Sequence, residues 1–179
     1  ARVLARLAAR DQDRDSNFHI PRRNERRAPL TYAQQGVWFR QQLAPESSVW
    51  DLSRSSHVNG PLDIAALERA LSVIVRRHES LRTRYVVVSG EPMQEVMPAA
   101  PVAIELVDAR RPANGADRAA DFRGRLAGRA FDLASPVMVR AGVAILGEES
   151  HELTITRHHI CSDQWSSGIF RRELSRAYH

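Results

Sequence analysis

Two adjacent histidines and a nearby aspartate are the residues of this chain whose types and spacing could do chemistry. His158 and His159 close an apolar, strand-like run, and Asp163 follows four residues after the second histidine. Successive side chains of a strand point to opposite faces, so only one of the two histidines can face a given cavity. A histidine placed in this way can take up or release a proton near neutral pH. Asp163 is close enough along the chain to brace the loop that carries the histidine. A proton-handling histidine on a braced loop fits acyl transfer without a covalent enzyme intermediate.

A hairpin and a helix are predicted to hold these residues. The hairpin strands span 137–146 and 152–156, separated by Gly147-Glu148-Glu149, and the second strand delivers the histidines. A final helix follows over 167–178. Its pattern still runs at the end of the given sequence.

Two earlier helices have clear start signals. Thr31 is the predicted N-cap of a helix to about Leu43, with Gln34 reaching back as in a capping box. Asp63 is the predicted N-cap of a helix from Ile64 to about His78. The apolar positions of this second helix follow helical spacing: Ile64, Leu67, Ala70, Leu71, Ile74 and Val75.

The remaining predicted elements are strands at 48–58 and 102–107, a hairpin at 81–88 and 92–97, and a helix at about 116–130 after Asn114-Gly115. This order of elements predicts an α+β fold, a mixed β-sheet with helices packed against it.

Composition indicates a soluble globular protein: 43% of the 179 residues are hydrophobic and 26% are charged. No apolar run approaches the roughly 18 to 20 residues that cross a bilayer, and the first residues lack the apolar core of a signal peptide. A single cysteine, Cys161, excludes an internal disulfide, so a cytoplasmic location with no membrane partner is expected.

The net charge of +5 does not indicate nucleic-acid binding. Residues 1–30 hold eight arginines and four acidic residues, which is +4, so the other 149 residues carry about +1. The globular part therefore lacks the basic stripe that neutralises a phosphate backbone.

Four segments of the chain carry recognisable motifs. Residues 30–38 (LTYAQQGVW) follow S-x-A-Q-x-R-L-W, and residues 77–85 (RHESLRTRY) follow R-H-E-x-L-R-T-x-F. Residues 131–140 (FDLASPVMVR) follow F-D-L-x-x-x-P-L-x-R, and residues 158–166 (HHICSDQWS) follow H-H-x-x-x-D-G-W-S. In this order over residues 29–178, the motifs resemble those of the condensation domains of non-ribosomal peptide synthetases.

Two positions depart from the family pattern. Gln164 stands where the family usually has glycine, and Gly36 where arginine is common. Glycine lets a loop backbone approach a substrate closely, so Gln164 puts the loop conformation and any oxyanion contact from its backbone N–H in question.

The resemblance implies a chloramphenicol acetyltransferase-like fold of two similar lobes around a tunnel. Residues 29–179 look like the N-terminal lobe, with the C-terminal lobe absent. Residues 1–28 are interpreted as a linker or the tail of an upstream domain, with a short helix over 1–10.

The resemblance also implies roles for the motif residues. His159 is the catalytic residue facing the tunnel, and His158 points into the lobe and is structural. Asp163 holds the loop through an ion pair with an arginine, the alternative being a solvated loop aspartate. Gln164, Trp165 and Ser166 form the active-site loop. The structural motif residues are Gln34, Trp38, Arg77, His78, Glu79 and Arg82, and both Trp38 and Trp165 are expected in the core.

Cys161 beside two histidines raises the alternatives of a cysteine nucleophile or a zinc site. The histidines at 151, 158 and 159 with Cys161 lack the paired short spacings of structural zinc sites, so no metal is expected. Cysteine enzymes also usually draw their histidine from elsewhere in the chain.

The implied reaction joins an upstream acyl or peptidyl thioester to a downstream aminoacyl thioester as an amide. Donor and acceptor carrier proteins would be the partners and would deliver phosphopantetheine arms, with no cofactor bound by the lobe itself. Alternatives are an epimerisation-type relative, or a non-catalytic module that docks carrier proteins, which the Gln164 departure motivates. Cyclisation relatives replace both histidines with aspartate and do not fit.

Overall fold

The computed structural model describes residues 25–110 and 115–179. In chain order its elements are β1 (Arg27–Pro29), α2 (Tyr32–Leu43), β2 (Asp51–Asn59), α3 (Ile64–Arg77), the 3-10 helix η1 (Glu79–Arg82), β3 (Thr83–Val88), β4 (Glu91–Val96), β5 (Ile104–Asp108), α4 (Gly115–Gly128), β6 (Val139–Gly147), β7 (Ser150–His158) and α5 (Gln164–Tyr178). The predicted helix over 1–10, the linker up to residue 24 and Asn114 lie outside the described residues.

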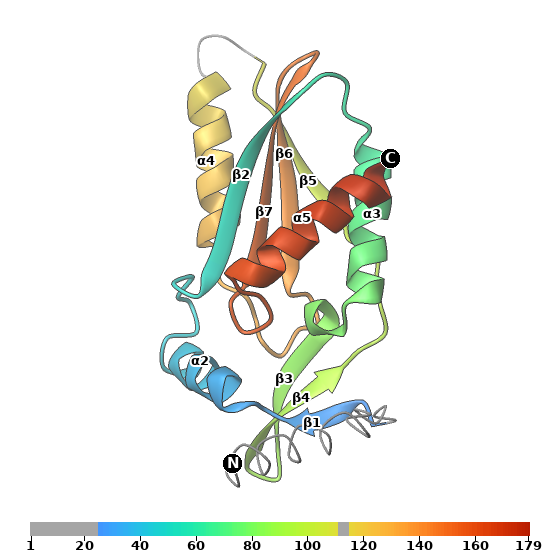
Figure 1. Ribbon diagram of the computed structural model, residues 1–179. Coiled ribbons are helices and arrows are strands. Elements are labelled where there is room, and N and C mark those ends of the chain that lie inside the picture. Colours follow the sequence, from blue (N-terminus) through green and yellow to red (C-terminus); the bar gives the residue numbers. More distant parts are fainter. Residues whose placement is uncertain (1–24, 111–114) are drawn as a thin grey trace, which may run out of the picture.

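A four-stranded sheet in the order β2-β7-β6-β5 forms the centre of the fold (Figure 1). β7 is antiparallel to both β2 and β6, whereas β5 is parallel to β6, so the sheet is mixed, as predicted. The predicted second hairpin, β6–β7, lies in the middle of this sheet. The pairing of β7 with β2 places His158, at the end of β7, opposite Asp51, at the start of β2.

One face of the sheet packs against α3 and α5. The buried residues of α3 follow the predicted helical spacing, and they contact Phe170 and Leu174 of α5. The sheet contributes alternate residues of β6, Val139, Ala141 and Val143, to the same cluster, because alternate side chains of a strand share a face. This cluster fixes α5, whose first turn lies next to the two histidines.

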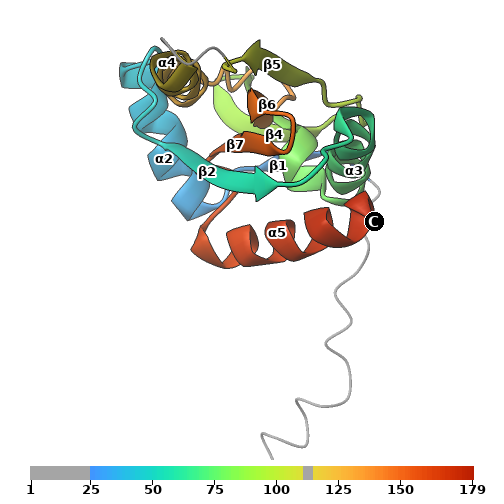
Figure 2. The same ribbon diagram turned by 90° about the horizontal axis from the view of Figure 1, so that it is seen from above.

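The opposite face of the sheet packs against α4 (Figure 2). Phe122 and Leu126 of α4 pack on Ala144 of β6. Gly142 lies under this helix, where an added Cβ would be 2.3 Å from Leu126 Cδ1 and 2.7 Å from Phe122 Cζ. The absence of a side chain at residue 142 is therefore what lets α4 approach the sheet.

A second, three-stranded sheet in the order β1-β4-β3 contains the predicted first hairpin. β1 was not predicted: Arg27–Pro29 pair with residues 93–95 of β4, so the fold begins within the segment interpreted as a linker up to residue 28. Leu30 and Tyr85 of this region pack with Ile160 of the histidine motif. The small sheet thereby supports the loop that carries the candidate site.

The predicted helix starts at Thr31 and Asp63 are confirmed. The Thr31 hydroxyl accepts the Gln34 N–H, and the Gln34 side chain accepts the Thr31 N–H, which completes the capping box. The Asp63 carboxylate accepts the Ala66 N–H at 2.9 Å.

Candidate active site

The two adjacent histidines lie in different environments at the end of β7. His158 is the last residue of the strand and is fully buried, with 0% of its surface exposed. His159 follows the strand and is exposed, and its backbone N–H donates to the Trp50 carbonyl at 2.7 Å. The alternation of strand side chains therefore separates the two rings, one into the lobe and one to its surface.

The ring of His158 is held as a neutral imidazole. Its Nδ1 accepts the Ile160 N–H at 3.1 Å, so the neutral ring carries its proton on Nε2. The Phe131 ring stands at 77° to the imidazole, with 6.0 Å between ring centres. Burial, with smaller effects from His159 and Arg140, lowers the pKa of His158 to about 4. His158 is thus neutral at physiological pH, because desolvation penalises the imidazolium form.

The exposed ring of His159 contacts Trp50. The two rings stand edge to face at 83°, with 6.3 Å between their centres. Trp50 precedes β2 and is 109 residues away in the sequence, so β2 and β7 together determine the surroundings of His159.

Asp163 is the N-cap of α5. Its carboxylate accepts the Ser166 N–H at 2.7 Å, while the Ser166 hydroxyl accepts the Asp163 N–H at 2.8 Å. These bonds from Ser166 lower the pKa of Asp163, so its carboxylate is ionised at neutral pH. The capping box fixes the loop after His159 to the start of α5.

The expected ion pair between Asp163 and an arginine is not formed among the residues that the structure describes. Arg157 instead donates to the Ser167 hydroxyl at 2.8 Å, and this hydroxyl donates to the Asp163 carbonyl at 2.7 Å. Arg157 therefore contacts the loop through the Ser167 hydroxyl and not through the Asp163 carboxylate.

Gln164 and Trp165 occupy the first turn of α5, and both are exposed. Positive φ values among the described residues occur at Ser89, Gly60 and Gly90, so the backbone of Gln164 does not require glycine.

The expectation that Trp165 is a core residue is wrong, because its exposed fraction is 82%. Residues 165 and 170 are about 140° apart around a helix, and the face with Phe170 is the buried one. Trp38, by contrast, is partly buried against the cluster that contains Ile160.

The other motif residues lie away from the histidines and hold elements together. Gln34 bonds Gln94 of β4 at 3.3 Å, and Arg82 pairs with Glu79. His78 and Arg77, at the end of α3, both contact the Glu173 carboxylate of α5. The second motif therefore ties α3 to the helix that carries the active-site loop.

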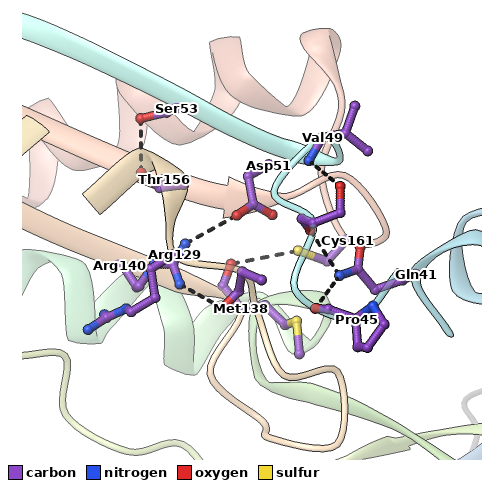
Figure 3. A network of polar contacts seen from close by, with 12 residues as sticks. Gln41, Pro45, Val49, Asp51, Ser53, Arg129, Met138, Arg140, Thr156 and Cys161 are labelled. Atoms are coloured by element: carbon purple, nitrogen blue, oxygen red, sulfur yellow. Dashed lines mark hydrogen bonds and ion pairs between the residues drawn. The ribbon is translucent and has the colours of Figure 1, made fainter. Parts of the chain in front are cut away.

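A buried ion pair beneath the histidines was missed by the sequence analysis. Arg140 Nη2 lies 3.2 Å from Asp51 Oδ2, and the Asp51 side chain is 1% exposed (Figure 3). The Arg140 guanidinium stacks on Phe131 at 3.7 Å from the ring centre, next to His158. Phe131 and Arg140 are the first and last residues of the third motif, so the motif could have indicated that they contribute to the site. Asp51 lies 89 residues from Arg140 and belongs to none of the four motifs, so no sequence pattern indicated its pairing with Arg140.

The surroundings of Cys161 do not favour a nucleophilic thiol. Burial raises the pKa of the Cys161 thiol to about 12, and the thiol donates to the His158 carbonyl. Such a thiol is neutral at physiological pH, whereas a nucleophilic cysteine needs a thiolate. Within residues 25–110 and 115–179, no three His, Cys, Asp or Glu side chains are grouped to hold a metal ion. No helix in the same ranges is long and apolar enough to span a membrane.

A groove of about 730 Å³ runs between β2 and α5. Arg157 and Gln164 line the end near the motif loop, and Phe170, Leu174 and Tyr178 line its length. His159 is not part of this lining. The exposed histidine and the groove are therefore separate features of the described residues.

Comparison with known proteins gives consistent matches. The chain is 37% identical over 152 residues to a linear gramicidin synthase of Brevibacillus parabrevis, and 33% identical over 178 residues to the malpinin synthetase of Mortierella alpina. These alignments cover 84% and 99% of this chain but only 2% of each synthetase. The chain thus spans a small part of the curated relatives it matches.

Solved structures match the fold. The first condensation domain of the CDA synthetase aligns with a TM-score of 0.77 and 27% identity, over 85% of this chain and 40% of that one. The starter condensation domain of the rhizomide synthetase aligns with a TM-score of 0.78 at 18% identity, over 85% of this chain and 38% of that one. The predicted α+β, chloramphenicol acetyltransferase-like fold is confirmed. A family model for the Condensation domain matches residues 24–179, and the chain belongs to this family of peptide-synthetase domains.

Proposed function

We propose that this chain is the N-terminal, active-site-bearing lobe of a condensation domain that forms an amide bond. The donor would be an upstream acyl or peptidyl thioester and the acceptor a downstream aminoacyl thioester, both on the phosphopantetheine arms of carrier proteins. A second lobe of the same domain would supply the other wall of the tunnel. The observation that carries this proposal is the exposure of His159 beside the buried, neutral His158.

The reaction would begin with attack of the acceptor amine on the thioester carbonyl carbon. A C–N bond forms, the C–S bond breaks, the nitrogen loses a proton and the departing sulfur gains one. An α-amine has an ordinary pKa of roughly 7.7–8.0, so a useful fraction is neutral without a strong base. Holding the two thioesters in one tunnel could lower the barrier by roughly 7–11 kcal/mol.

His159 would orient the amine and accept its proton at the tetrahedral intermediate, an effect of about 10² to 10⁴ in rate. Its exposure supports this role, because a proton acceptor must reach the substrate. His158 fits a structural role, since its Nδ1 is used by the Ile160 N–H and its ring is fully buried. Asp163 and Ser166 would hold the loop by capping α5.

The test is a condensation assay with a complete domain that contains this chain and two loaded carrier proteins. Amide product that depends on His159 supports the proposal, and the exposed His57 on β2 offers a matched control, His57→Ala. Binding of both carriers without product would indicate the docking module instead. Inversion of the donor α-carbon while the donor stays bound as a thioester, without amide, would indicate the epimerisation-type relative. The 179-residue chain alone is expected to give no turnover.

A further inference from the structure

Trp50 contacts His159 through both its backbone and its side chain. Its carbonyl accepts the His159 N–H at 2.7 Å, and its indole stands edge to face with the imidazole. The Arg40 guanidinium of α2 lies 5.5 Å from the centre of the Trp50 ring. The half-buried indole is thus held between a helix and the exposed histidine, which limits the directions that both rings can take.

The backbone that carries Trp50 is fixed on both sides. After it, Asp51 is anchored by the buried pair with Arg140, which also donates to the Ala130 carbonyl at 3.2 Å (Figure 3). Before it, the buried Gln41 side chain donates to the carbonyls of Pro45 and Ser47, each at 3.0 Å. An irregular segment with this many buried polar contacts has a defined position.

We infer that Trp50 is a positioning residue for His159: its indole orients the imidazole, and the Asp51–Arg140 pair and Gln41 fix the backbone on either side of Trp50. This inference rests on the proposed function of His159. An exposed side chain otherwise samples several staggered rotamers, and an aromatic edge-to-face contact favours one of them. Loss of orientation lowers the rate of the chemical step while leaving substrate binding largely intact.

The experiment compares Trp50→Ala and Trp50→Phe with the wild-type complete condensation domain that contains this chain. Tyr32→Ala is the matched control, because Tyr32 is an aromatic residue of α2 with an exposed fraction of 93%. Trp50→Ala is expected to lower kcat about tenfold with KM changed less than about twofold. Trp50→Phe, which keeps an aromatic ring, is expected to restore most of this loss, and Tyr32→Ala to match the wild type.

A double-mutant cycle separates orientation from a general loss of structure. Trp50→Ala added to His159→Ala is expected to cause no further decrease, because the ring to be oriented is already absent. The His159 ring proton signals in NMR spectra should also shift in Trp50→Ala, since the indole ring current is lost. Equal kcat in Trp50→Ala and wild type, or a full additional loss in the double variant, would overturn the inference. If His159→Ala itself retains full activity, the proposed function fails instead.

Discussion

Replacement of Asp51 by asparagine is expected to change how the stability of the chain depends on pH. Burial raises the pKa of Asp51 from 3.8 to about 6, although Arg140 at 3.2 Å partly opposes this effect. The folded state therefore binds more protons than the unfolded state between these two values. The stability that Asp51 contributes is fully present below pH 3.8 and is lost as the pH rises through about 6.

The size of the effect follows from the two pKa values. A pKa difference of one unit between the folded and unfolded states corresponds to about 1.4 kcal/mol. Between about pH 4.5 and 7.5, the stabilisation that the raised pKa of Asp51 contributes falls by about 2 kcal/mol. The asparagine side chain has the shape of a protonated aspartate and does not titrate. The wild type should therefore lose about 2 kcal/mol of unfolding free energy relative to Asp51→Asn over this range.

Urea denaturation of both proteins at a series of pH values measures this difference. Asp121→Asn, at an exposed position of α4, is the matched control and should run parallel to the wild type. A difference between wild type and Asp51→Asn that does not change with pH would refute the reasoning. It would show that Arg140 keeps the Asp51 carboxylate ionised without cost.

Three further outcomes are expected from the packing and capping contacts. Gly142→Val should destabilise the chain by about 1–3 kcal/mol in urea denaturation, because the valine side chain would clash with α4. At Gly124 an added Cβ meets nothing within 4 Å, so Gly124→Ala should stabilise the chain by about 0.5–1 kcal/mol. Equal effects of the two changes would contradict the close approach at Gly142. Asp163→Ala should lower the urea midpoint and Asp163→Asn should lower it less, since asparagine also caps helices; equal midpoints would argue against the capping role. Cys161, which is partly buried, should react with a thiol reagent at about pH 8 far more slowly in the folded than in the urea-unfolded chain, and similar rates would contradict the raised pKa of its thiol.

Local signals explain what could be predicted from the sequence. The starts of α2 and α3 followed from Thr31 and Asp63, because capping involves residues only three positions apart. The separation of His158 from His159 followed from strand alternation. The motifs then placed these elements in a known fold.

Contacts between distant segments explain what could not. β1 has three residues including Pro29, and it exists because β4 offers partners more than 60 positions away. The Asp51–Arg140 pair and the Trp50–His159 contact likewise join segments with no shared pattern. Trp165 was assigned to the core from its residue type alone. The final helix was predicted to begin at residue 167, but α5 begins at Gln164 and presents Trp165 on its exposed side.

The most direct test of the central claim is the single-turnover rate of amide formation with both carrier proteins preloaded. In a complete domain that contains this chain, His159→Ala is expected to lower this rate by about 10² to 10⁴, while His57→Ala leaves it unchanged. A His159→Ala rate equal to that of the wild type would contradict the assignment of proton transfer to this exposed imidazole.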